Sequence, residues 1–81
     1  MVEHQTEQSR FVINVGSQQA VLKYEEGGGD IDFTSTFVPD NLRGQGLAEK
    51  LVHAGLAWAR DQGYTIHASC WYVRLWLDRG R

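Results

Sequence analysis

A glycine-containing segment in the middle of the chain, Arg43 to Ala48, has the residue types best suited to bind an anion. It stands directly before a stretch with helical periodicity. The first backbone N–H groups of a helix have no partner inside it, and the helix dipole adds partial positive charge there. Gly44 and Gly46 leave room for a ligand to approach, and Arg43 adds a formal charge. The segment therefore predicts a site for a phosphate-bearing ligand at the start of the helix.

Cys70 is the candidate nucleophile, provided that a nearby base or positive charge stabilises its thiolate. His67 stands three residues earlier on a predicted strand, so the two side chains should point to opposite faces, which argues against a Cys–His pair. The alternative for Cys70 is a buried, unreactive thiol. Asp30 and Asp32 could attract a cationic amine or be solvated hairpin residues. The three histidines and single cysteine are too scattered for a metal site, so none is predicted.

Around these residues, alternating apolar positions predict strands and a period near 3.6 predicts helices. The predicted strands are 10–15, 18–26, 31–38 and 64–70, and the predicted helices are 45–62 and 71–79. Within the third strand, Ile31, Phe33 and Phe37 should share one apolar face. Gly63 should end the first helix in the left-handed conformation. The fold class is therefore α+β, in the order β-β-β-α-β-α.

The short connections predict how these elements are arranged. The first three strands should form an antiparallel meander. The fourth strand returns through the long helix, so it should lie parallel to the third, with the helix packed on the sheet. Residues 1–9 are predicted to be a disordered polar lead-in, and residues 10–81 a single domain.

Composition narrows the classes of function. The hydrophobic content of 42% indicates a globular fold, and a net charge of −2 gives no basic surface for nucleic acid. A single cysteine cannot form an internal disulfide, which fits a reducing compartment. No apolar run approaches the ~18 residues of a membrane span, and the N-terminus lacks a signal peptide's apolar core. We therefore expect a cytoplasmic protein that binds neither membranes nor nucleic acids.

Two motifs carry a resemblance to a known family. Arg43, Gly46 and Ala48 match the pattern R-x-x-G-x-A, and the segment fits neither a P-loop nor a dinucleotide fingerprint. Here the chain resembles the GNAT superfamily of acetyltransferases, whose pyrophosphate loop is written Q/R-x-x-G-x-G/A. The segment from Ser69 to Val73, SCWYV, is similar to the C-x-Y-V segment of the small GNAT-like N-acetyltransferase domain-containing family. The resemblance covers nearly the whole chain.

This resemblance implies an acetyl-CoA-dependent N-acetyltransferase that moves an acetyl group to an amine of a small molecule or a protein. It implies Cys70 as a catalytic residue near the acetyl group and Tyr72 as the nearest match to the tyrosine that protonates the departing thiolate. Backbone N–H groups of the glycine loop would bind the pyrophosphate of coenzyme A. The residues implied to bind the coenzyme are Phe37, Val38, Asn41, Leu42, Arg43, Gly44, Gln45, Gly46, Leu47 and Ala48.

Two other functions stay open at this point. The domain could bind coenzyme A or acetyl-CoA without catalysis, or it could be a protein-interaction domain in which the glycine loop only caps a helix. The short chain leads us to expect an open acceptor site, low activity or a partner that completes the site. For quaternary structure we expect a monomer or a weak homodimer.

Overall fold

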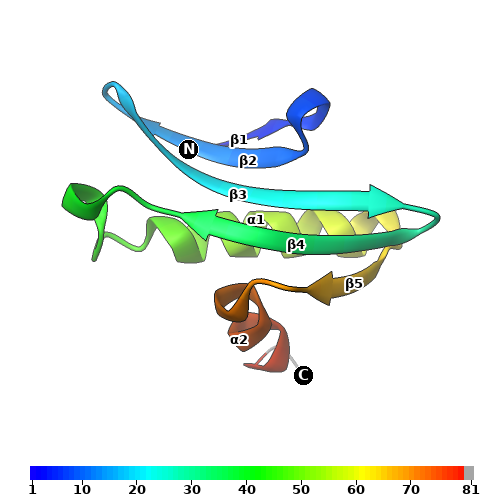
Figure 1. Cartoon of the computed structure of the whole chain (residues 1–81). Helices are drawn as coiled ribbons and strands as arrows, with labels where there is room; N and C mark the ends of the chain where they lie inside the picture. Colours follow the sequence, from blue (N-terminus) through cyan, green and yellow to red (C-terminus); the bar gives the residue numbers. More distant parts are fainter. Residues whose placement is uncertain (80–81) are drawn as a thin grey trace.

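The computed structural model describes residues 1–79, which form one five-stranded sheet and two α-helices (Figure 1). The last two residues of the predicted domain, 80 and 81, lie outside the described residues. The elements are β1 (Val2–Gln5), the 3-10 turn η1 (Thr6–Gln8), β2 (Arg10–Val15), β3 (Gln18–Gly27), β4 (Asp30–Phe37), the 3-10 turn η2 (Asp40–Leu42), α1 (Leu47–Gln62), β5 (Thr65–Ala68) and α2 (Trp71–Arg79).

The predicted α+β class is confirmed. Strands β2, β3 and β4 form an antiparallel meander, and β5 pairs in parallel with β4. Helix α1 covers one face of the sheet, and α2 follows β5 at the sheet edge (Figure 1). The strand order β1-β2-β3-β4-β5 follows the chain, so α1 is the crossover that makes the last pair parallel.

Helix α1 forms because its apolar residues recur on one side and pack on the sheet. Its buried residues are Leu47, Leu51, Val52, Gly55, Leu56 and Ala59. Gly63 ends the helix as predicted, with a φ of 80° and its N–H directed at the last carbonyl groups. A Cβ at Gly55 would lie 2.9 Å from the Leu22 side chain. Helix α1 therefore lies closer to the sheet at Gly55 than a residue with a Cβ atom would allow.

The prediction of a disordered lead-in was wrong for residues 2–5, which form β1 at the sheet edge. His4 pairs in register with Phe11, and the two rings stack with centroids 4.0 Å apart. The His4 Nε2 atom lies 2.7 Å from the Tyr24 hydroxyl, and its ring meets Trp58 edge-on at 4.6 Å. The segment looks polar in sequence, but the imidazole packs as an aromatic ring once β2 and α1 are beside it.

Strand β4 contains a β-bulge opposite β3. Tyr24 pairs with Phe33, but Lys23 pairs with Ser35, so three residues of β4 oppose two of β3. A slip of one residue turns every later side chain to the other face. Phe33 is fully buried, whereas Phe37 is 58% exposed. The prediction that Ile31, Phe33 and Phe37 share one face was therefore wrong. The residues between Phe33 and Phe37 are polar, so the sequence does not reveal that the alternation of inward and outward side chains shifts there.

Candidate functional site

The loop before α1 exposes backbone N–H groups, as its glycines predict. Gly44 and Gly46 have φ angles of 86° and 76°, which favour glycine. The first helical hydrogen bond runs from the Lys50 N–H to the Gly46 carbonyl at 3.1 Å. The N–H groups of the preceding first turn therefore have no partner inside the helix. Nothing lies within 4 Å of a Cβ built on either glycine, so the space in front of this turn is open.

Arg43 adds a cation beside these N–H groups. Its Nε donates to the Val38 carbonyl at 3.2 Å, and its Nη1 lies 3.2 Å from the Asp40 carboxylate. Both contacts link the guanidinium to the chain between β4 and α1. The Arg43 side chain is nevertheless 64% exposed, so the guanidinium can also contact a ligand.

Cys70 lies at the N-terminal cap of α2, where its carbonyl accepts the Arg74 N–H at 3.1 Å. Its Sγ atom is 3.5 Å from the Thr36 hydroxyl of β4. Burial raises the pKa of the Cys70 thiol, but hydrogen bonds from Thr36 and from the N–H groups of Val73 and Tyr72 together outweigh burial and lower the pKa below its usual value. The helix start supplies the positive environment that a thiolate requires.

A cavity opens where β4 and β5 stop pairing. The last parallel pair is Phe33 with Ala68, and the Cys70 N–H adds one more bond to the Phe33 carbonyl at 3.0 Å. Beyond that point β4 continues to Phe37 while the chain after β5 turns into α2. The cavity has a volume of about 320 Å³. Its lining residues are Thr36, Val38, Arg43, Ala48, Cys70, Trp71 and Tyr72.

This cavity brings together five of the residues that the sequence singled out: Val38, Arg43, Ala48, Cys70 and Tyr72. Gly44, Gln45 and Gly46 form the loop beside it, and Leu47 begins α1 with its side chain in the core. The side chains of three further candidates lie elsewhere. Phe37 is exposed and Leu42 is buried in the core, while the Asn41 amide exchanges two hydrogen bonds with Gln18 at 2.8 and 2.9 Å.

Sequence reasoning missed Thr36 and Trp71. The bulge turns Thr36 to the face of the sheet that α1 covers, where it pairs with the buried Leu22. Thr36 lies 34 residues from Cys70, so no local motif predicts their contact. Trp71 is 72% exposed at the first position of α2. Its place within the C-x-Y-V segment was the only signal available in the sequence.

The other polar candidates, Asp30, Asp32 and His67, form hydrogen bonds between β4 and the chain of β5 and the turn after it. The Asp32 carboxylate accepts the Ser69 N–H at 2.8 Å and the Ser69 hydroxyl at 2.7 Å. His67 is exposed, and its Nε2 lies 3.3 Å from the Asp30 carboxylate. His67 does not line the cavity that holds Cys70. Asp32 therefore holds the turn that precedes Cys70, and His67 belongs to a separate surface pair.

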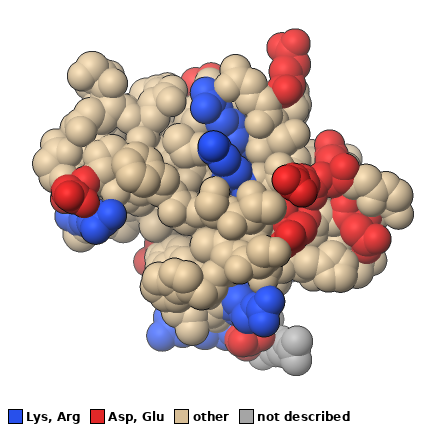
Figure 2. Space-filling model, in the orientation of Figure 1, with Lys and Arg blue, Asp and Glu red and all other residues tan. Residues whose placement is uncertain are grey.

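One acidic cluster is separated from the glycine loop, whereas Asp40 and Glu49 lie close to the loop. Figure 2 shows red side chains gathered at the right, where Figure 1 places the turn between β3 and β4. Glu25 pairs there with Asp32, and Asp30 begins β4. Helix α1 begins at the opposite end of the sheet (Figure 1). An anion at the start of α1 is therefore distant from this acidic cluster.

The fold and the site define the class of protein. Residues 10–81 match the GCN5-related N-acetyl-transferase family, and the chain belongs to that family. A solved structure of a GCN5-like protein from Staphylococcus aureus has a TM-score of 0.76 and 26% sequence identity, covering 99% of this chain and 79% of that one. Among the described residues, no helix is both long and apolar enough to cross a membrane.

The curated relatives include Protein NATD1 from several vertebrates. The chicken protein (Gallus gallus) is 34% identical over 79 residues, which cover 94% of this chain and 72% of that protein. The bovine protein (Bos taurus) is 36% identical over 76 residues, covering 90% of this chain and 67% of that protein. At this coverage the matched regions span both the glycine loop and the segment around Cys70.

Proposed function

We propose that this domain binds acetyl-CoA at the start of α1 and transfers its acetyl group to an amine. One observation carries the proposal: the glycine loop and the Cys70 thiol, which are far apart in sequence, border the same cavity. The open space at Gly44 and Gly46 fits a diphosphate against the N–H groups of the first turn. When bound, the coenzyme supplies an activated acetyl thioester.

In this proposal, different residues along the cavity contact different parts of the coenzyme. Arg43 and the N–H groups of the first turn of α1 bind the diphosphate. Val38 and Thr36, at the end of β4, flank the coenzyme's arm. Cys70 holds its Sγ at the reacting end, where its lowered pKa favours the thiolate. Tyr72 lines the same cavity and is the proposed donor of a proton to the departing thiolate.

A second candidate function is coenzyme binding without turnover. Neither a carboxylate nor a histidine is among the residues that line the cavity, so only Cys70 or Tyr72 could deprotonate the incoming amine there. If the acceptor brings no base of its own, the domain would hold acetyl-CoA without transferring the group. For either role we propose a reducing, cytoplasmic setting, because the single cysteine has to remain a free thiol.

The test is isothermal titration of the protein with acetyl-CoA and with CoA, using Gly46→Glu as the probe variant. The new carboxylate occupies and repels the anion site, so affinity should fall by more than about tenfold. A carboxylate near the first turn favours the helix dipole, so the helix itself should persist. Gly63→Glu is the matched control, because Gly63 has a similar φ of 80° and open space at the other end of α1.

Equal affinity in the wild type and Gly46→Glu would overturn the site. Absence of binding by the wild type at millimolar ligand would overturn both the transferase and the binding module. Where binding holds, incubation with acetyl-CoA and a panel of amines, followed by mass spectrometry, separates the two functions. Acetylated amine that disappears in Cys70→Ala supports transfer through Cys70, and the absence of any acetylated product supports the binding module.

A further inference from the structure

The free edge of β5 carries backbone groups that no other strand pairs. Within residues 1–79, β5 pairs only with β4 and is the last strand of the sheet (Figure 1). The Thr65 N–H donates to the Gly29 carbonyl at 2.9 Å, so the backbone groups of Thr65 point to the β4 side. Along a strand these groups point alternately to its two sides. Ile66 and Ala68 therefore direct their N–H and C=O groups to the free edge.

The contacts of Ala68 agree with this direction. Its carbonyl accepts two hydrogen bonds from the Arg74 side chain of α2, from Nη2 at 2.8 Å and from Nε at 3.2 Å. The next N–H along the chain, that of Ser69, points back and donates to the Asp32 carboxylate of β4 at 2.8 Å. In the described part of the chain, the Ile66 N–H, the Ile66 carbonyl and the Ala68 N–H have no hydrogen-bond partner. Unpaired groups of this kind on a sheet edge are a template for an added strand.

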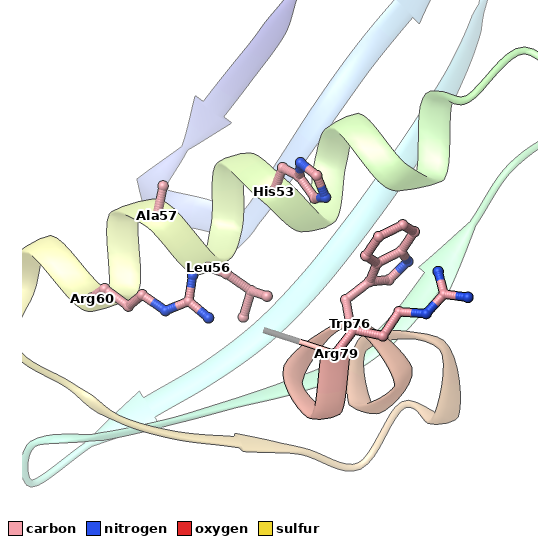
Figure 3. Close-up of a pocket in the computed structure, with 6 residues that line it drawn as sticks. All are labelled: His53, Leu56, Ala57, Arg60, Trp76 and Arg79. Atoms are coloured by element: carbon pink, nitrogen blue, oxygen red, sulfur yellow. The ribbon is translucent and has the colours of Figure 1, made fainter. Parts of the chain in front are cut away.

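A groove with a volume of about 330 Å³ lies along this edge. Helix α2 forms its far wall, because Arg74, Leu77 and Asp78 are three and four positions apart and share one face of the helix. Trp76 points instead towards His53 of α1, with ring centroids 5.1 Å apart (Figure 3). The groove is therefore on the side of α2 that faces away from α1. Its lining residues are Ile66, His67, Ala68, Arg74, Leu77 and Asp78.

The charges around the groove favour a basic occupant. The Arg74 guanidinium is engaged with a backbone carbonyl, and within residues 1–79 it forms no salt bridge with Asp78. The exposed Asp78 carboxylate is therefore free to pair with a cation from outside. At the other end of the groove, β5 begins beside the acidic cluster of the turn between β3 and β4, where Thr65 pairs with Asp30 (Figure 2).

We propose that the free edge of β5 binds an extended, basic segment of another protein as a sixth strand of the sheet. An extended peptide is the occupant whose own N–H and C=O groups match such an edge, and every second side chain of it would face α2. A lysine or arginine of the segment pairs with Asp78, and an apolar side chain packs on Leu77. The inference does not depend on coenzyme binding, because no residue of this groove lines the cavity that holds Cys70.

The probe is a capped pentapeptide of alternating lysine and valine, titrated to millimolar concentration into the whole chain without coenzyme. Backbone NMR should show that the amide signals of Ile66 and Ala68 shift and that their hydrogen exchange slows. The amides of Thr65 and His67 point to β4 and should change less. Asp78→Asn should weaken binding about threefold. The matched control is Asp61→Asn, which removes an exposed carboxylate of α1 outside the groove and should leave the affinity unchanged.

N-methylation of the peptide distinguishes strand addition from a general attraction between charges. Only alternate N–H groups of an added strand face β5, so methyl groups on one alternating set should abolish binding and those on the other set should not. Equal effects of the two sets would overturn the proposal, as would absence of binding at millimolar peptide. Shifts of the Ile66 and Ala68 amides that depend on protein concentration alone would also overturn it, because a second copy of the chain would then occupy the edge.

Discussion

Replacing Thr36 by Val should raise the pKa of Cys70 and slow its alkylation. The Thr36 hydroxyl lies 3.5 Å from Sγ, and a charged acceptor gains more from such a donor than a neutral thiol does. Loss of one hydrogen bond of this kind costs about 1 kcal/mol. That energy corresponds to an approximately fivefold lower thiolate fraction at a pH below the pKa. The N–H donors of Tyr72 and Val73 remain, so the thiolate should be weakened and not abolished.

The assay is the rate of reaction with iodoacetamide as a function of pH, because the thiolate is the reacting species. The midpoint of the wild-type profile should lie below that of an ordinary cysteine, and the Thr36→Val midpoint should lie above the wild-type value. Thr34→Val is the matched control. Thr34 lies on the same strand, but its hydroxyl donates to the Lys23 carbonyl at 3.3 Å and does not contact Sγ.

Two results would refute this reasoning at different points. Identical midpoints for the wild type and Thr36→Val would mean that the hydroxyl does not stabilise the thiolate. A wild-type midpoint at or above the usual value would mean that burial outweighs all the hydrogen bonds at Cys70. In that case Cys70 would be an inert buried thiol, and the proposed nucleophile would have to be abandoned.

Two further predictions concern stability. Gly55→Ala should lower the free energy of unfolding by about 1 kcal/mol in urea titrations, because a Cβ 2.9 Å from buried Leu22 overpacks the core by more than helix propensity returns. Gly27→Ala, where nothing lies within 4 Å, should change it by less than about 0.5 kcal/mol, and equal effects would contradict the close approach of α1. Burial lowers the pKa of His4 in the folded state below its ordinary value of 6.5. The unfolded chain therefore binds the proton more readily, and the free energy of unfolding should decrease as the pH falls below 6.5. In urea titrations from pH 7.5 to 5, the free energy of unfolding of His4→Gln should fall less than that of the wild type. An equal fall in both proteins would contradict the packed imidazole beside Tyr24.

The fold could be predicted where the signal is local. The helical period of residues 47–62, the glycine at position 63 and the short turns specify α1 and the meander without long-range information. The parallel pairing of β5 with β4 then follows from the length of the connection. The same reasoning failed for β1, whose pattern is polar. His4 becomes a core-edge residue only when Phe11 and Trp58 lie beside it.

The bulge in β4 shows a different limit of sequence patterns. Alternation predicts the face of a side chain only while the register is unbroken. Between Phe33 and Phe37 the intervening side chains are small and polar, so no buried apolar residue between them marks the register. The pairing with β3 decides the matter, and it turns Phe37 outward and Thr36 inward. The contact between Thr36 and Cys70 depends on that single extra residue.

The sequence by itself predicted the open start of α1, because its glycines and its unpaired N–H groups are properties of six consecutive residues. It also identified Cys70 as a residue of interest through a short motif. Only the tertiary structure decided what surrounds that thiol. Thr36 meets it across 34 residues, and the turn into α2 supplies the N–H groups that lower its pKa. The edge-on contact of the His53 and Trp76 rings likewise exists only because α2 lies beside α1, an arrangement that no local pattern specifies.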